Sequence, residues 1–233
     1  MPHLHKLSIS GFIFLFAACA APLNALEIEY AKVFDVTGSV KFAGFKSGRW
    51  QPLLRNLLLK SGTRVKTGNQ SSVQIKLNRD FTGVLKLSPN SYLELKNEPP
   101  NKIYLEKGDL FVICEADTEA APAAGSGALQ VSTKDLLMEI RQGGCIISVS
   151  DRGTWLKVFQ EKVEAAHVLA DRTKTKTWTV HEGYQLHAKS SGAHTSLKRM
   201  QYENYDAWQV WIRGWYDHKD KIAAEKMRKE LSA

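Results

Sequence analysis

The chain has 233 residues, of which 43% are hydrophobic, and it carries a formal net charge of +8 with a pI of about 9.3. This length and hydrophobic content are sufficient for one domain with a buried core, and they exclude a chain that is disordered throughout. The positive charge favours contact with anionic surfaces such as lipid head groups, acidic glycans or nucleic acid. The Lys and Arg residues are spread along the chain singly or in short groups, which is more typical of a solvated basic surface than of one anion-binding tract.

The N-terminal segment has the pattern of an export signal. A short start with one Lys precedes an apolar run over residues 7–21. The run is shorter than the roughly 20 apolar residues that a membrane span needs, so we predict a secretory signal peptide over residues 1–25 rather than an uncleaved anchor. Cleavage after Ala25 would give a soluble product that begins at Leu26. Lipoprotein processing would instead lipidate Cys19, although Phe16 occupies a position where such signals usually carry Leu.

Residues 31–189 read as many short strands between turns. Val73, Ile75 and Leu77 alternate with polar residues, and the same period of two recurs at Leu85 and Leu87. Gly, Pro and Asn clusters separate these segments at short intervals. The pattern predicts an all-β body of short antiparallel or solenoid-like strands, arranged as a sandwich or a β-helix. Residues 116–128 contain no large apolar side chain, which predicts a flexible loop.

Two cysteines lie within this β body. Removal or lipidation of Cys19 would leave Cys114 and Cys145, each beside a predicted strand. In an oxidising compartment they could form a disulfide, worth about 3 to 4 kcal/mol in the chain-entropy model. They could equally be two separate buried thiols, each packed as a small hydrophobe. The sequence leaves both interpretations open, because it does not show whether the two Cβ atoms face each other.

Residues 200–232 form a segment with a different period. Its aromatic and aliphatic side chains recur at spacings of three and four, which places them on one stripe of an amphipathic helix. The residues are Tyr205, Trp208, Trp211, Ile212 and Trp215. Such a stripe either docks on a neighbouring sheet or contacts a partner, so these five residues are the candidates for partner docking.

The sequence contains no recognisable catalytic or metal-binding motif. It has no Gly-x-Ser-x-Gly elbow, no Gly-rich phosphate loop and no His-Glu-x-x-His motif. His181, His187 and His194 recur at intervals of six and seven residues but have no Cys or carboxylate at ligand spacing, so surface histidines are the simpler interpretation. We therefore predict a protein that is not an enzyme, with no cofactor and no metal site.

Seven short segments of the β body follow one another in a characteristic order and spacing. They are residues 38–40, 50–53, 59–68, 71–77, 84–95, 104–110 and 181–186. Together they resemble the FecR domain family over about residues 31–189, most strongly from residue 38 to residue 114. The second half departs from the family, because Arg141–Cys145 stands where an Arg-Gly-Thr element is usual and Gln160–Lys162 replaces a Gly.

The resemblance implies an exported, non-catalytic binding or scaffolding module in the periplasm or outer envelope of a bacterium. An envelope protein, glycan or lipid component is the expected partner, nucleic acid is not, and membrane contact would come only from lipidation of Cys19. The alternative is a signal-transducing component, in which the module receives a transporter's signal and a cytoplasmic segment controls a sigma factor. Since about six residues precede the apolar run, no cytoplasmic domain is expected. A glycan-active β-solenoid enzyme is less favoured, because the strand pattern places no pair of carboxylates on one face.

Overall fold

The computed structural model describes residues 29–77, 82–96, 102–115, 128–168, 174–189 and 195–230. The predicted signal peptide with Cys19, and all of the predicted loop 116–128 except its last residue, lie outside the described residues.

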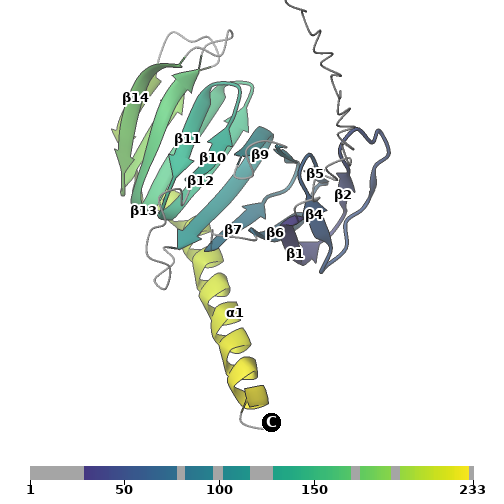
Figure 1. The fold of residues 1–233 in the computed structure, drawn as a ribbon. Helices are drawn as coiled ribbons and strands as arrows, with labels where there is room; N and C mark the ends of the chain where they lie inside the picture. Colours follow the sequence, from purple (N-terminus) through teal and green to yellow (C-terminus); the bar gives the residue numbers. More distant parts are fainter. Residues whose placement is uncertain are drawn as a thin grey trace, which may run out of the picture.

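The described residues form sixteen strands, a short 3₁₀ helix and one long C-terminal helix, which confirms the prediction of an all-β body with a helical tail (Figure 1). The first eight strands are β1 (Glu29–Thr37), β2 (Val40–Ala43), β3 (Gln51–Pro52), β4 (Leu58–Lys60), β5 (Arg64–Thr67), β6 (Ser72–Leu77), β7 (Thr82–Leu87) and β8 (Tyr92–Leu95). The other eight are β9 (Lys102–Glu115), β10 (Leu129–Ser132), β11 (Leu136–Ile140), β12 (Gly143–Ser150), β13 (Gly153–Val168), β14 (Lys174–His181), β15 (Tyr184–Ala188) and β16 (Thr195–Arg199). The helices are η1 (Tyr202–Asn204) and α1 (Asp206–Glu230). Strand β16 thus extends the β body beyond residue 189.

Two long strands join the two sheets of the body. The C-terminal part of β9 pairs with β7 and β12, and its N-terminal part pairs with β8 and β10. Strand β13 likewise pairs first with β12 and β15 and then with β11 and β14. Glu161, with φ of 60°, lies in β13 between the two sets of partners, at the place where the sequence departs from the family's Gly. Pairing runs through β9, β12, β13, β11, β10 and back to β9, so these five strands close a small barrel.

We refer to the two sheets as sheet A and sheet B. Sheet A contains β1, β4, β6, β7, β12, β15, β16, the C-terminal part of β9 and the N-terminal part of β13. Sheet B contains β2, β3, β5, β8, β10, β11, β14, the N-terminal part of β9 and the C-terminal part of β13.

The main core lies between the two sheets and follows from the period-two pattern. Val73, Ile75 and Leu77 of β6 all point into it. Strand β9 contributes Val112 and Cys114 to this core, whereas Phe111 and Ile113 belong to a second apolar cluster on the outer side of sheet A. This strand is therefore buried on both faces, as its uninterrupted apolar sequence predicts.

Turns packed on serine hydroxyls explain several of the FecR-like segments. Gly108 has φ of +89°, and a Cβ at this position would lie 1.9 Å from Ser91 Oγ, so only Gly fits. The Ser91 hydroxyl accepts a hydrogen bond from the backbone N–H of Asp109 at 3.0 Å. Gly38 and Ser71 repeat this arrangement, with 2.5 Å between the would-be Cβ and Oγ. These motif residues shape the fold, and no ligand is needed to explain them.

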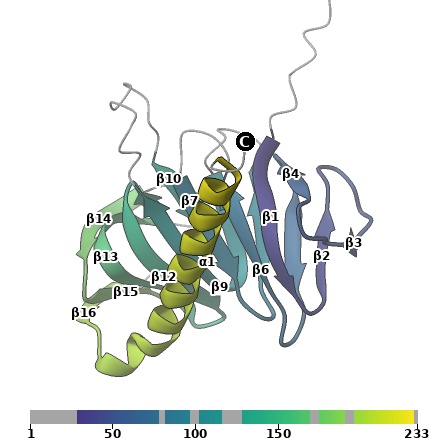
Figure 2. The ribbon, with the colours of Figure 1, turned by 90° about the horizontal axis from the view of Figure 1, so that it is seen from below.

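Helix α1 lies across the outer side of sheet A (Figure 2). Its burial pattern repeats every three or four residues at Trp208, Trp211 and Trp215, which are 4%, 5% and 9% exposed. No helix within the described residues combines the length and the apolar character that a membrane crossing needs.

Candidate functional site

The aromatic stripe of α1 packs on the chain's own sheet. The Trp208 ring stacks on Phe159 with 4.9 Å between centroids and 3° between planes. Gly144 of β12 makes room for it, because a Cβ there would lie 2.3 Å from Trp208 Cη2. The edge of Trp211 meets Phe111 at 5.2 Å and 77°.

A short polar chain anchors the N-terminal part of the helix. Trp211 Nε1–H donates to Gln74 Oε1 at 3.2 Å, and Gln74 Nε2 donates to Asp35 Oδ2 at 3.3 Å. Further along the helix, Lys219 forms an ion pair with Glu115 of β9 at 2.7 Å. These contacts fix the helix in register on sheet A.

The five partner-docking candidates thus all lie on the side of the helix region that faces the β body. Trp208, Trp211 and Trp215 are buried, and Tyr205 and Ile212 are half-buried against the same cluster. Among the side chains of α1 up to residue 221, which the structure describes, the large apolar ones left open to a partner are Val210, at 76% exposed, and Tyr216, at 42% exposed.

The cysteine pair is not bridged in the structure. Cys114 and Cys145 are both free and buried, and they lie on the neighbouring strands β9 and β12. The residue opposite Cys114 is Gly143, and the one opposite Cys145 is Val112, so the two thiols are diagonal neighbours. Diagonal Cα atoms are about 7 to 8 Å apart, beyond the usual span of a disulfide. The possible disulfide is therefore replaced by two buried thiols, and burial raises the pKa of Cys114 to about 12 and that of Cys145 well above its ordinary value.

Two of the three histidines considered as metal ligands lie in the described part of the chain, on different strands. His187 on β15 stacks on Trp155 with 3.7 Å between centroids, His181 is exposed at the end of β14, and His194 lies outside the described residues. Within the described ranges, no group of three or more His, Cys, Asp or Glu side chains is placed to hold a metal ion.

A buried carboxylate serves the turn between β10 and β11. Asp135 is 5% exposed, and its Oδ2 accepts a hydrogen bond from Thr154 Oγ1 at 2.8 Å. The Thr133 hydroxyl accepts from the backbone N–H groups of Asp135 and Leu136, at 3.2 and 2.9 Å. Because these contacts close the turn and pair the carboxylate, the cluster has a structural role.

The most distinctive cluster of charged and aromatic side chains at the surface lies on the outer side of sheet B, and we call it the Trp50 face. It consists of Lys41, Trp50, Arg64, Lys66 and Tyr92. Lys66 Nζ lies 4.0 Å from the centroid of the Trp50 ring, and Arg64 Cζ lies 5.6 Å from it. The Tyr92 ring meets Trp50 edge-on at 5.9 Å. Two cations and two aromatic rings thus share one surface.

The local sequence explains why these side chains point outward. Strand β5 alternates, so that Val65 and Thr67 are buried while Arg64 and Lys66 face solvent. Lys41 of β2 lies directly opposite Lys66, and Tyr92 of β8 lies opposite it on the other side. Like charges placed opposite each other across strands destabilise a sheet. The Lys41–Lys66 pair therefore has a cost in stability that the fold alone does not explain.

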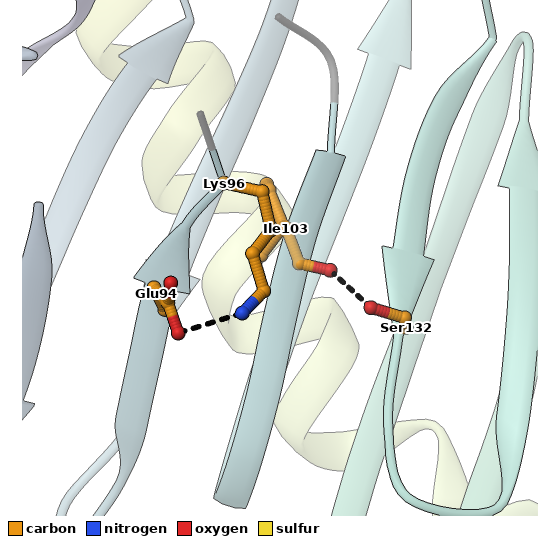
Figure 3. A network of polar contacts seen from close by, with 4 residues as sticks. All are labelled: Glu94, Lys96, Ile103 and Ser132. Carbon is orange, nitrogen blue, oxygen red and sulfur yellow. Dashed lines mark hydrogen bonds and ion pairs between the residues drawn. The ribbon is translucent and has the colours of Figure 1, made fainter. Parts of the chain in front are cut away.

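The charge on the Trp50 face is not neutralised locally. Glu94 is opposite Arg64 in the register, but its carboxylate is paired with Lys96 at 2.8 Å (Figure 3). Arg64 instead donates to the backbone carbonyl of Ser47. Within the described part of the chain, Lys41, Arg64 and Lys66 have no ion-pair partner.

One local feature of the sequence indicates this basic surface, although the overall composition does not reveal it. Between Asp35 and Asp80 there is no acidic residue, while nine basic residues occur. They are Lys41, Lys46, Arg49, Arg55, Lys60, Arg64, Lys66, Lys76 and Arg79. The informative feature is a long stretch of sequence without Asp or Glu. A search for dense runs of Lys and Arg overlooks it.

Comparisons with known proteins do not assign the chain to a family. No family model and no curated protein matches it. Two crystal structures of a protein described as a candidate anti-sigma factor from Parabacteroides distasonis are similar, with TM-scores of 0.48 and 0.47 and sequence identities of 12% and 14%. The similarity covers 63% of this chain and 64% and 63% of those chains, so less than two thirds of their length is spanned. A likeness at this level does not bear on what the chain does.

Proposed function

We propose that the chain is a non-catalytic, FecR-type binding module of the bacterial cell envelope, and that its Trp50 face holds a polyanionic envelope component. The observation that carries the proposal is that Arg64 and Lys66 lie over a half-buried Trp50 ring, with Lys41 opposite Lys66 on the neighbouring strand. None of these three cations has an ion-pair partner among the described residues. The helix packs on the outer side of sheet A, so it leaves the Trp50 face of sheet B uncovered.

The electrostatics of the face favour a ligand with repeated negative charges. Cations on neighbouring strands can contact successive anionic groups, and a net positive surface raises the association rate of such ligands. Trp50 and Tyr92 add flat apolar surface, which favours a ligand with rings or alkyl groups beside its charges. Acidic polysaccharides and anionic lipid head groups both have this chemistry.

The direct test is binding of the full chain to two defined polyanions. Alginate represents acidic glycan, and vesicles of phosphatidylglycerol with phosphatidylethanolamine represent anionic lipid. The double change Lys41→Glu with Lys66→Glu should lower the affinity for the true class at least tenfold, because two contacts become repulsive. Affinity of the unmodified chain should fall as salt rises, since exposed charges are screened.

A matched control uses the far edge of the same sheet. Lys174 and Lys176 of β14 are exposed, and changing both to Glu alters net charge by the same amount. This control should keep most of the binding. Equal loss in both double variants would show that only net charge matters, and an unmodified chain that binds neither polyanion at low salt would overturn the proposal.

Location in the envelope is tested separately, by mass spectrometry of the protein from cells. A mature chain that begins at Leu26, or at a lipidated Cys19, supports export. An unprocessed chain that retains Met1 in the cytoplasmic fraction contradicts it.

A further inference from the structure

A tight turn with an exposed aromatic side chain lies beside the Trp50 face. It belongs to the loop that joins β2 to β3, and among the described strands β3 pairs only with β2, so this hairpin ends sheet B. The backbone N–H of Ser47 donates to the carbonyl of Gly44 at 3.0 Å and closes the turn. Phe45 lies within it at 55% exposed, and no other Phe of the described residues is as open to solvent. Figure 2 shows β2 and β3 at one end of the β body and β14 at the other.

Hydrogen bonds hold this turn against the Trp50 face. Arg64, which lies over the Trp50 ring, also donates to the backbone carbonyl of Ser47. The Ser47 hydroxyl accepts from the backbone N–H of Arg49 at 3.2 Å. The turn and the Trp50 face therefore form one continuous surface.

Lys46 occupies a backbone conformation that suits a smaller residue. It is the third residue of the turn and has φ of 58°, where Gly or Asn is favoured. Its Nζ lies 5.1 Å from the centroid of the Phe45 ring. Because Gly would fit this turn with less strain, the fold does not explain a cation beside Phe45.

The charges around Phe45 are strongly positive. Lys46 and Arg49 are exposed and add two cations to the three of the Trp50 face, and neither has an ion-pair partner among the residues whose placement is described. Glu94, the carboxylate opposite Arg64, is paired with Lys96. This surface is therefore complementary to a partner with many negative charges.

An exposed Phe among cations fits an anionic lipid bilayer better than an acidic polysaccharide. At a bilayer surface, an apolar ring enters the boundary of the acyl chains while Lys and Arg beside it reach the head groups. A sugar ring stacked on Trp50 would have to displace Lys66, whose Nζ lies 4.0 Å from the ring centroid.

We propose that the turn over residues 44–47 inserts Phe45 into the surface of an anionic lipid bilayer, while the cations of the Trp50 face contact the lipid phosphates. This inference rests on the polyanion binding proposed above, and it names a lipid surface as the polyanion. One inserted ring adds a short-range apolar contact to a salt-dependent attraction, so the binding is reversible.

Quenching of a fluorescent label tests insertion directly. The environment-sensitive dye NBD is attached to Phe45→Cys or, as a matched control, to Leu54→Cys. Leu54 is 68% exposed, but its turn is hydrogen-bonded to β1 of sheet A. Both variants also carry Cys19→Ser, which leaves the label one target because Cys114 and Cys145 are buried.

The vesicles contain phosphatidylglycerol, phosphatidylethanolamine and a lipid with a nitroxide on its acyl chain. They should quench the label at position 45 and leave the label at position 54 unquenched. Phosphatidylcholine vesicles should quench neither, because they offer no net negative charge. Equal quenching at the two positions would overturn the insertion.

Binding by unlabelled variants of the full chain gives a second measurement. Phe45→Ser should weaken vesicle binding about tenfold, because it removes the buried ring, and should leave any binding to alginate unchanged. Lys46→Gly should weaken vesicle binding about fivefold. Leu54→Ser is the control and should change neither. All samples share residues 1–28, so a difference between them reports the turn.

The outcomes separate this inference from the proposed function. Vesicle binding by Phe45→Ser that equals that of the unmodified chain would overturn the insertion. Binding to alginate that depends on Lys41 and Lys66, without binding to vesicles, would identify an acidic glycan as the ligand. That result would overturn the lipid surface and leave the proposed function intact, whereas a chain that binds neither polyanion would overturn both.

Discussion

The two outer faces of the β body are built from the same strand pattern, but one is covered by a helix and the other is open to solvent. On sheet A the outward positions are filled by Phe111, Ile113, Ile146 and Phe159, and α1 covers them. On sheet B the corresponding positions carry Arg64, Lys66, Tyr92 and Glu94, and they remain open. On both sheets, the outward residues alternate along each strand with residues that point into the same core. The outward residues alone therefore decide whether a sheet needs a cover or offers a surface.

The largest expected difference between the faces is in what a Trp contributes to stability. Trp211→Ala should lower the free energy of unfolding by about 3 to 5 kcal/mol, because it leaves a cavity against Phe111 and removes the hydrogen bond to Gln74. Trp50→Ala, on the open face, should cost about 1 kcal/mol or less. Urea unfolding followed by circular dichroism measures both. Similar costs for the two changes would break the distinction between a covering face and a binding face.

A smaller effect tests the fit under the helix. Gly144→Ala should cost about 1 to 3 kcal/mol, because the added methyl meets Trp208 Cη2 at 2.3 Å. In the Trp208→Ala background the same change should cost little, which gives a coupling energy in a double-mutant cycle. Gly44→Ala is the control on the open side, since no atom lies within 4 Å of the added Cβ. A zero coupling energy would mean that Trp208 does not rest on Gly144.

The interior shared by both faces can be probed through its two thiols. Burial raises the pKa of Cys114 from about 9 to about 12, and that of Cys145 well above 9. The unfolded chain therefore loses these protons first as pH rises above about 9, and stability falls by about 1.4 kcal/mol per pH unit for each thiol until its folded pKa is reached. The stability is fully present below about pH 9.

The measurement compares the unmodified chain with Cys114→Ala plus Cys145→Ala between pH 9 and pH 12. Other groups titrate in this range, so the difference in slope between the two proteins is the quantity of interest. Parallel slopes would show that the thiols are not buried as the structure has them, or that they are oxidised.

Local patterns were sufficient to predict the strands and the helix stripe. Alternation in residues 73–77 and the three-four spacing from Tyr205 to Trp215 report which side of each element is apolar, and that is a property of neighbouring residues. The uninterrupted apolar run of β9 likewise indicates a strand buried on both faces, and Phe111 and Ile113 lie in the second cluster while Val112 lies in the main core.

Pairing between distant segments could not be predicted in this way. Strand β13 is one continuous element over 16 residues, whereas its sequence suggests two strands separated by Gln160–Lys162. Its bend at Glu161 depends on two sets of partners that only the fold brings together. The diagonal placement of Cys114 and Cys145 has the same origin, since strand register sets it. The Trp50 face also depends on register, because Lys41 and Lys66 lie 25 positions apart in the chain.

The smallest expected effect on stability is also the most specific test of the open face. Lys41→Glu replaces a like-charge pair with an attractive one opposite Lys66, so the free energy of unfolding should stay unchanged or rise by a few tenths of a kcal/mol, up to about 1 kcal/mol. The same change should weaken polyanion binding, because a cation of the Trp50 face becomes an anion. A residue that opposes stability and supports binding is expected at a functional surface and not at a structural one.

Thermal unfolding at low and high salt measures the effect of Lys41→Glu on stability, and the gain in stability should shrink as salt screens the pair. If Lys41→Glu destabilised the protein while binding persisted, the two lysines would have a role in the fold, and the two faces would differ less than the structure indicates.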